Sequence, residues 1–238
     1  MSARTALARQ LHRAAMYRLC AIALAYPSPG RFAEVAAAAE RIVDAAAPPL
    51  RARVRALAAA ARAASEAEAA AEYVALFHGA ARCIPCEGAY GPVRMAGKSA
   101  ELADIAGFYA AFGMEPSAGE PEIEDHVATE LEFMSALALK EAWALAEAHY
   151  EHAEISADAT AAFLRDHLAR WIPAFAAALD GATTAPYYRA VAALLTAWVA
   201  QDVAALGVTV EPLPTAAATP AAAEPFACPM AGEQPADA

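Results

Sequence analysis

The sequence predicts an all-α fold: a single-domain helical bundle over residues 1–207, followed by a Pro- and Ala-rich mobile tail over residues 208–238. Alanine, leucine, glutamate and arginine, which favour helix, are abundant along the chain. Apolar residues recur every three or four positions, and the long alternations typical of strands are missing. With 238 residues, the chain is long enough for one sizeable domain.

Apolar stripes broken by prolines predict four helices in the first third of the chain. The first stripe ends where Pro27 and Pro29 interrupt it, and Pro48-Pro49 separates the next two. Ser65 is suited to cap the start of the fourth helix, because its hydroxyl can accept a hydrogen bond from a free backbone N–H. We expect these helices at residues 7–26, 31–46, 50–63 and 65–77.

A change of composition marks residues 79–97, GAARCIPCEGAYGPVRMAG, as a long loop inside a helical protein. Loops of this length are uncommon unless they are functional or disordered. The clustered cysteines and Tyr90 argue against simple disorder. We therefore expect the loop to contribute to the functional site.

Four more helices are expected in the rest of the chain. They cover residues 99–112, residues 123–151, a segment that begins at Ser156 or Asp158, and residues 186–206. The third of these carries Phe163, His167 and Trp171 at spacings of four, which places them on one helical face. We expect His167 to be a core histidine that bonds to a neighbour, with a groove-lining position as the alternative.

The charge balance and the hydropathy pattern exclude several classes of partner. The chain has 17 basic and 28 acidic residues, a formal charge of −11. Nucleic-acid binding does not fit, because phosphate contacts need a basic face, whereas a cationic partner suits an acidic surface. No apolar stretch reaches the ~20 residues of a spanning helix, and the N-terminus does not resemble a signal peptide. We expect a cytoplasmic protein without stable membrane insertion.

The common catalytic and cofactor-binding motifs are absent from the sequence. No histidine follows a glutamate by three residues, so the carboxylate di-metal pattern of helical bundles is missing. Signatures of phosphate, dinucleotide, zinc-protease and acyl-transfer sites are missing too. We therefore expect no enzyme and no bound cofactor. His149 and His152 could share a metal, but they lie among charged residues typical of a solvated face.

Cys83 and Cys86 form a Cys-x-x-Cys pair in the loop. Two thiols at this spacing can bind one metal ion or form a disulfide. A structural zinc site would need two more ligands, for which Cys228 in the tail and His78 are the candidates. The alternative is that the cysteines pack the loop as small apolar side chains.

An acidic cluster stands at the start of the helix expected at 123–151. Glu124 and Asp125 lie where carboxylates interact favourably with the helix dipole. His126 and Glu130 are four residues apart and share one face of the helix. On these grounds a structural role and a ligand-binding role are equally compatible with the cluster.

Four motifs in fixed order resemble the TorD/DmsD/NarJ family of cytoplasmic maturation chaperones for molybdenum enzymes. They are Tyr73-x-x-Leu76-Phe77; the loop with Pro85, Glu87 and Tyr90; Asp125-His126-x-x-x-Glu130-Leu131-x-Phe133-Met134; and Phe163-Leu164-x-x-His167-Leu168-x-x-Trp171-x-Pro173-x-Phe175. The resemblance covers roughly residues 10–206. The CIPCEGAYGP loop is most similar to that of the delta-subunit chaperones of type II dimethyl-sulfoxide-reductase-like enzymes.

The resemblance implies an all-helical, non-enzymatic protein that binds the apo catalytic subunit of a molybdoenzyme, often at its twin-arginine signal peptide. The resemblance implies that the peptide is bound by six residues: Leu76, Phe77, Pro85, Glu87, Asp125 and His126. Tyr90 and Glu130, which belong to the same motifs, are added as further peptide-binding candidates. Two positions depart from the family pattern. Glu124 stands where proline usually precedes the Asp-His pair, and Gly88 stands where serine is common.

The chemistry of a twin-arginine signal agrees with this assignment. Such a signal joins two guanidinium groups to an apolar run, so its receptor needs carboxylates beside an apolar groove. The leading hypothesis is therefore a chaperone that holds the immature subunit until the cofactor is inserted. The alternatives are a carrier that uses Cys83, Cys86 and Cys228 to deliver zinc or an iron–sulfur component, and a helical scaffold without a client signal.

Overall fold

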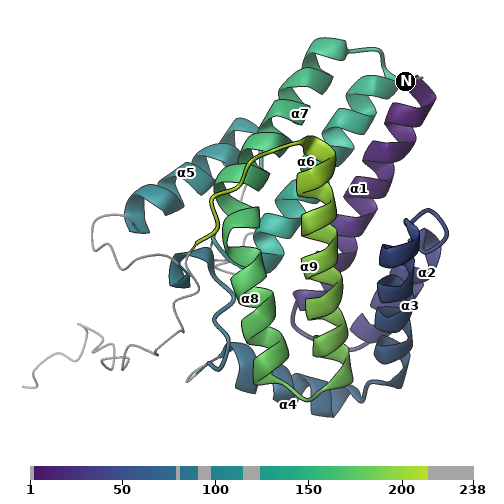
Figure 1. The fold of residues 1–238 in the computed structure, drawn as a ribbon, viewed down its shortest axis with the longest axis vertical. Coiled ribbons are helices and arrows are strands. Elements are labelled where there is room, and N and C mark those ends of the chain that lie inside the picture. The colour runs from purple at the N-terminus through teal and green to yellow at the C-terminus, as the bar shows by residue number, and fades with distance from the viewer. Residues whose placement is uncertain (1–2, 79–80, 91–97, 115–123, 214–238) are drawn as a thin grey trace, which may run out of the picture.

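The computed structural model describes residues 3–78, 81–90, 98–114 and 124–213, and the prediction of an all-α fold is confirmed (Figure 1). No strand occurs among these residues. The helices are α1 (Ala3–Leu24), α2 (Arg31–Ile42), α3 (Pro48–Ala63), α4 (Glu66–Phe77), α5 (Lys98–Ala111), α6 (Val127–Ala146), α7 (Tyr150–Phe163), α8 (Ala169–Ala182) and α9 (Pro186–Leu206), with short turns η1 (Glu87–Ala89) and η2 (Leu164–Leu168).

The helices pack around one apolar core. Helix α6 lies between α1 and α7, while α9 contacts α8, α3 and α1, and α2 pairs with α3 (Figure 1). The six largest fully buried side chains are aromatic: Trp171, Tyr17, Tyr188, Phe133, Phe163 and Phe175. One core therefore connects the first and last helices of the chain.

Most helices lie where the sequence predicts them, but two predicted boundaries are wrong: the helix expected over 31–46 ends at Ile42, and the helix expected to begin at Ser156 or Asp158 begins at Tyr150. Ser65 caps α4 as expected, with its Oγ accepting a hydrogen bond from the backbone N–H of Glu68. The single helix expected over 123–151 is wrong: α6 ends at Ala146 and α7 begins at Tyr150. Ala148 adopts a left-handed φ of 58° between them. Because Ala148 has a helix-forming side chain, the sequence pattern did not reveal this turn.

The helix expected through Phe163 and Trp171 also has an irregularity that periodicity did not reveal. Residues 164–168 form a π-helical turn, η2, which joins α7 to α8. A π turn adds a residue to the helical repeat, so side chains after it are rotated relative to those before it. Such turns are frequent at functional sites, and this one contains His167.

Helix α9 is the one described helix that is long and apolar enough, by length and composition, to span a membrane. The expectation that no stretch reaches this length therefore does not hold for α9. Of its most apolar 18-residue window, 39% is buried inside the protein. Its buried face belongs to the core shared with α8, α3 and α1.

The fold continues past the expected boundary at residue 207. Gly207 ends α9 with a left-handed φ of 65°, a conformation that glycine adopts without strain. Residues 208–213 then follow α8: Leu213 N–H donates to Arg170 O at 2.9 Å, and Arg170 Nε donates to Glu211 O. The sequence predicts that these residues belong to the tail, and Pro212 disfavours helix here, but a segment outside a helix can still pack: Val208, Val210 and Leu213 contact the core. The remainder of the expected tail, 214–238, lies outside the described residues.

Candidate functional site

Three distant segments of the chain meet around the Cys-x-x-Cys loop. Residues 81–90 of the loop run beside the segment that leads into α6, and Cys86 and His126 form an isolated antiparallel bridge. Glu87 N–H donates to Asp125 O at 2.9 Å, and Val127 N–H donates to Pro85 O at 2.8 Å. The third segment is η2 with the start of α8. Two of the four motifs of the family resemblance are thus hydrogen-bonded to each other.

The Asp125 carboxylate points back to the loop. Its Oδ2 accepts a hydrogen bond from Gly88 N–H at 3.0 Å, and the residue is buried. The cap of α6 is instead His126, whose Nδ1 accepts a hydrogen bond from Ala128 N–H at 3.2 Å. Asp125 therefore fixes the short turn η1, and His126 satisfies the helix end.

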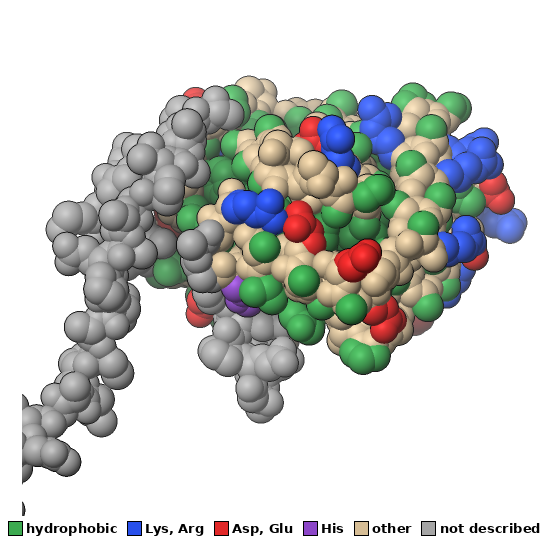
Figure 2. Space-filling view, turned by 90° about the horizontal axis from the view of Figure 1, so that it is seen from below, with side chains coloured by type: hydrophobic (Ala, Val, Ile, Leu, Met, Phe, Trp, Pro, Cys, Tyr) green, Lys and Arg blue, Asp and Glu red, His purple; other side chains and the backbone are tan. Residues whose placement is uncertain are grey.

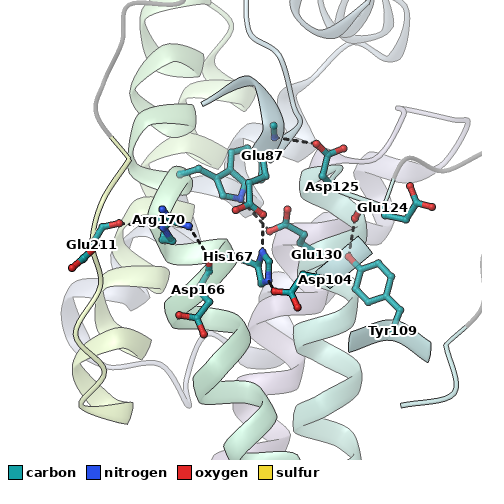
Figure 3. A network of polar contacts seen from close by, with 12 residues as sticks. Glu87, Asp104, Tyr109, Glu124, Asp125, Glu130, Asp166, His167, Arg170 and Glu211 are labelled. Atoms are coloured by element: carbon teal, nitrogen blue, oxygen red, sulfur yellow. Dashed lines mark hydrogen bonds and ion pairs between the residues drawn. The ribbon is translucent and has the colours of Figure 1, made fainter. Parts of the chain in front are cut away.

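His167 lies between two carboxylates, so the expectation of a core histidine satisfied by neighbours is confirmed. Its Nδ1 is 3.1 Å from Glu87 Oε2, and its Nε2 is 3.1 Å from Asp104 Oδ2 (Figure 3). Burial alone would lower the pKa of His167, but the hydrogen bonds and charges of Glu87 and Asp104 raise it above the usual value. The arrangement suits a protonated imidazolium that both carboxylates stabilise.

Glu130 is the most deeply buried of the carboxylates, with no exposed surface. Its Oε2 accepts a hydrogen bond from Trp171 Nε1 at 3.1 Å, while its Oε1 has no hydrogen-bond partner among the described residues. Burial, and next the charge of Glu87, raise the pKa of Glu130 well above its usual value. Burial therefore favours the neutral, protonated form of the Glu130 side chain.

We call Glu87, Asp125, Glu130 and His167 the polar cluster. Its members come from the loop, the start of α6 and η2. Figure 3 shows the side chains of Glu87, Glu130 and His167 turned toward one another, while the Asp125 carboxylate points to the backbone of the loop. Around the polar cluster lies an aromatic layer, in which the Tyr90 ring lies 5.4 Å from that of Trp171. A buried acidic cluster with a perturbed histidine is a common setting for function, although structural networks perturb pKa values too.

The eight candidate peptide-binding residues lie in one region of the structure, but their side chains are largely buried. Seven of them are buried, and His126 is half-buried. Phe77 and Tyr90 each contact the Phe175 ring, and Leu76 O accepts a hydrogen bond from Cys83 N–H. The sequence therefore predicted that these residues come together, but not that the carboxylates face inward.

Sequence reasoning missed Asp104 as a partner of His167. Asp104 lies on α5, and its side chain is 65% exposed. No motif distinguishes it, because a single aspartate on an exposed helical face is ordinary. Its role depends on the packing of α5 beside η2, which residue spacing along the chain does not reveal.

The cysteines do not form a metal site among the described residues. Cys83 is buried, and its Sγ lies 3.7 Å from the Tyr90 hydroxyl. Burial raises the pKa of its thiol to about 11, which disfavours the thiolate that binds metals. No group of three or more His, Cys, Asp or Glu side chains in the described ranges could hold a metal ion. Cys228 lies outside those ranges.

The His149–His152 pair lies where α7 begins. The two rings are 5.6 Å apart and nearly perpendicular, and His149 also packs on the Trp143 ring. Both residues are exposed, as expected for a solvated face. No third metal-ligating side chain joins them among the described residues.

A separate cavity of about 160 Å³ opens where α3 ends and where α4 and α9 begin. Alanines make up half of its lining residues, and Tyr187, Tyr188 and Glu68 also line it. Figure 2 shows this end of the molecule, with a hollow lined by hydrophobic side chains and carboxylates nearby. A cavity of this size can hold one ring or one branched aliphatic side chain.

Comparison with known proteins gives two results. Residues 43–177 match the family described as nitrate reductase delta subunit. The chain is also similar to a chlorate reductase assembly chaperone protein from Ideonella dechloratans, with 36% identity over 117 residues. That match covers 48% of this chain and 58% of the relative's length. The range 43–177 contains the whole polar cluster and Trp171.

Proposed function

Because this chain belongs to the nitrate reductase delta subunit family, in agreement with the resemblance found in its sequence, we propose that it is an assembly chaperone for a molybdenum-containing oxidoreductase. It would bind the immature catalytic subunit in the cytoplasm and hold it until the cofactor is inserted. The observation that carries the proposal is the convergence of the loop, the start of α6 and η2 within the matched range.

The similar protein from Ideonella dechloratans narrows the class of client. That relative is named as an assembly chaperone for chlorate reductase. We infer that the client of this chain is the catalytic subunit of a type II dimethyl-sulfoxide-reductase-like enzyme. A binding role without catalysis fits the polar cluster, whose side chains make their hydrogen bonds inside the protein, to one another or to Gly88 and Trp171.

The proposed client contact includes the twin-arginine signal peptide. Guanidinium groups would engage Asp125 and Glu87, and the apolar run would pack on aromatic side chains such as Phe77. Since both carboxylates are buried, this binding requires the loop 81–90 to separate from the start of α6. The loop bonds to that segment through few hydrogen bonds, which makes local opening less costly than global unfolding.

Co-purification tests the proposal directly. Full-length tagged protein is recovered from native extract under anaerobic conditions, and its partners are identified by mass spectrometry. We expect a molybdoenzyme catalytic subunit in its cofactor-free form, with its signal peptide retained. Recovery of only mature, cofactor-loaded subunit, or of no molybdoenzyme subunit, would contradict the proposal.

Calorimetry with the synthetic signal peptide of that subunit tests the peptide contact. Affinity should fall with added salt, because ion pairs are screened over a Debye length of ~8 Å at physiological ionic strength. A peptide in which both arginines are replaced by glutamine is the matched control. Equal affinity for the two peptides would refute the carboxylate contact.

A further inference from the structure

Three large apolar side chains on α1 and α6 are exposed to solvent. The exposed fraction is 48% for Leu11, 51% for Leu139 and 57% for Trp143. Single exposed apolar residues need no explanation, but a group of them rimmed by polar residues is typical of an interaction site. The question is whether these three belong to one surface.

The contacts between α1 and α6 show that the exposed side chains of the two helices lie on the same face of the protein. The helices lie side by side and run antiparallel, since Gln10 bonds to Glu141 whereas Arg18 pairs with Glu132 (Figure 1). Leu11 precedes Arg18 by seven residues, and Leu139 follows Glu132 by seven. Seven residues are two helical turns, so Leu11 and Leu139 lie at one level on the side marked by the Arg18–Glu132 pair.

Trp143 and two cations extend the same surface. Trp143 follows Leu139 by one turn of α6, and Arg4 precedes Leu11 by two turns of α1. Lys140 is exposed beside Leu139. We call Arg4, Leu11, Leu139, Lys140 and Trp143 the α1–α6 face.

The charge of the α1–α6 face is opposite to that of the whole protein. The chain carries a formal charge of −11, yet α1 contains no acidic residue and four arginines, of which Arg13 is buried and paired with Asp202. On this side of α6, Glu132 is engaged by Arg18, and Glu147 stands one turn beyond Trp143. The apolar side chains are thus bordered by Arg4 and Lys140 and by the Arg18–Glu132 pair, with Glu147 beyond Trp143.

Buried polar contacts hold the two helices that carry this face. Arg13 Nε donates to Asp202 Oδ1 at 2.8 Å, and Tyr17 Oη donates to Asp202 Oδ2 at 2.8 Å, which ties α1 to α9. Gln10 Nε2 donates to Glu141 Oε1, which ties α1 to α6. A face fixed in this way is preorganised, so a partner need not order it on binding.

We propose that the α1–α6 face docks an acidic, amphipathic segment of the client catalytic subunit, at a site separate from that of the signal peptide. This inference rests on the proposed function. Trp143 and Leu139 would insert between apolar side chains of the segment, because aromatic anchors dominate interface energetics. Arg4 and Lys140 would pair with its carboxylates and so exclude basic partners.

The test measures binding of the full-length protein to the cofactor-free catalytic subunit without its signal peptide, by calorimetry. A Leu139→Ser/Trp143→Ala variant should bind at least roughly tenfold more weakly, as expected for the loss of anchor residues. Val74→Ser, at a residue of α4 that is 48% exposed, is the matched control and should bind like the wild type.

A second variant tests the charge independently of apolar packing. Arg4→Glu/Lys140→Glu leaves the core untouched and should weaken binding, most strongly at low salt. Trp143 is also a reporter, because Trp171 and Trp198 are buried: bound client should reduce quenching of tryptophan fluorescence by acrylamide. If Leu139→Ser/Trp143→Ala does not fold, the Arg4→Glu/Lys140→Glu variant and the quenching experiment determine whether the α1–α6 face binds the client.

The outcomes separate this inference from the proposed function. If the wild type binds the subunit and both variants bind equally well, the α1–α6 face is not a docking site, and the chaperone function stands. If the wild type binds no catalytic subunit, with or without its signal peptide, the proposed function fails, and this inference fails with it. A change in the oligomeric state of the isolated protein in the Leu139→Ser/Trp143→Ala variant would assign the face to a second copy of the chain and refute the client contact.

Discussion

Replacing the buried acid Glu130 with glutamine should change how the stability of the protein depends on pH. Glutamine preserves the shape of the side chain and can still accept the hydrogen bond from Trp171 Nε1. It cannot ionise, so it removes one titrating group from the centre of the polar cluster. Every other contact of the cluster is left in place.

The sign of this pH dependence follows from the number of protons that the folded and the unfolded protein bind. Burial and the charge of Glu87 raise the pKa of folded Glu130 above its usual 4.5, so above pH 4.5 the folded protein keeps a proton that the unfolded chain has lost. The free energy of unfolding then falls as pH rises, by up to about 1.4 kcal/mol per pH unit. The raised pKa of His167 gives a fall of the same sign, but only above pH 6.5, where the unfolded residue loses its proton.

Because Glu130 acts above pH 4.5 and His167 only above pH 6.5, the contribution of Glu130 to the pH dependence of stability can be measured between these values. Between about pH 5 and 6.5, the wild type should lose up to ~2 kcal/mol of stability relative to Glu130→Gln, the product of that slope and the interval. Urea unfolding followed by far-ultraviolet circular dichroism measures this difference. Glu132→Gln, on the same helix but in a surface pair with Arg18, is the control and should leave the slope unchanged. Equal slopes for the wild type and Glu130→Gln would refute the assignment of Glu130 as a buried neutral acid.

Three further predictions concern other buried side chains. Asp202→Asn leaves the Arg13 guanidinium buried without its counter-charge and should cost ~3–5 kcal/mol in urea unfolding; a cost below ~1 kcal/mol would contradict this role. Trp171→Ala should cost ~3–5 kcal/mol, and normal melting with lost client binding would instead assign Trp171 to the binding surface. Burial raises the pKa of Cys20 to about 12 and of Cys83 to about 11, so iodoacetamide should alkylate both at least roughly a hundredfold faster in urea than in the native protein, and comparable rates would contradict their burial.

The sequence was sufficient to predict most of the helices, because their signals are local. Apolar stripes, prolines and the Ser65 cap act over a few residues, and the structure has helices where they predicted them. The turn at Ala148 and the π-helical turn η2 were missed because neither contains a residue that periodicity marks as a breaker. Of the two, η2 contains buried side chains, Leu164, His167 and Leu168, and local propensity is a weak guide where tertiary packing contributes.

The candidate site, too, was predictable from the sequence in part. Motif order predicted that Glu87, Asp125 and Glu130 share one region, and the hydrogen bonds between loop and helix bring them there. Their burial was not predictable, because carboxylates are usually exposed unless paired. The side chains that permit this burial are His167 and Trp171, whose ring nitrogens bond to the carboxyl groups of Glu87 and Glu130.

Under the proposed function, burial of the polar cluster gives client binding a proton signature. The pKa of Glu130 is raised first by burial and then by the negative charge of Glu87. A guanidinium entering beside Glu87 would offset that charge and lower the pKa of Glu130, so a proton would leave the protein as the peptide binds. The heat of binding would then depend on the ionisation heat of the buffer in the wild type, and much less in Glu130→Gln.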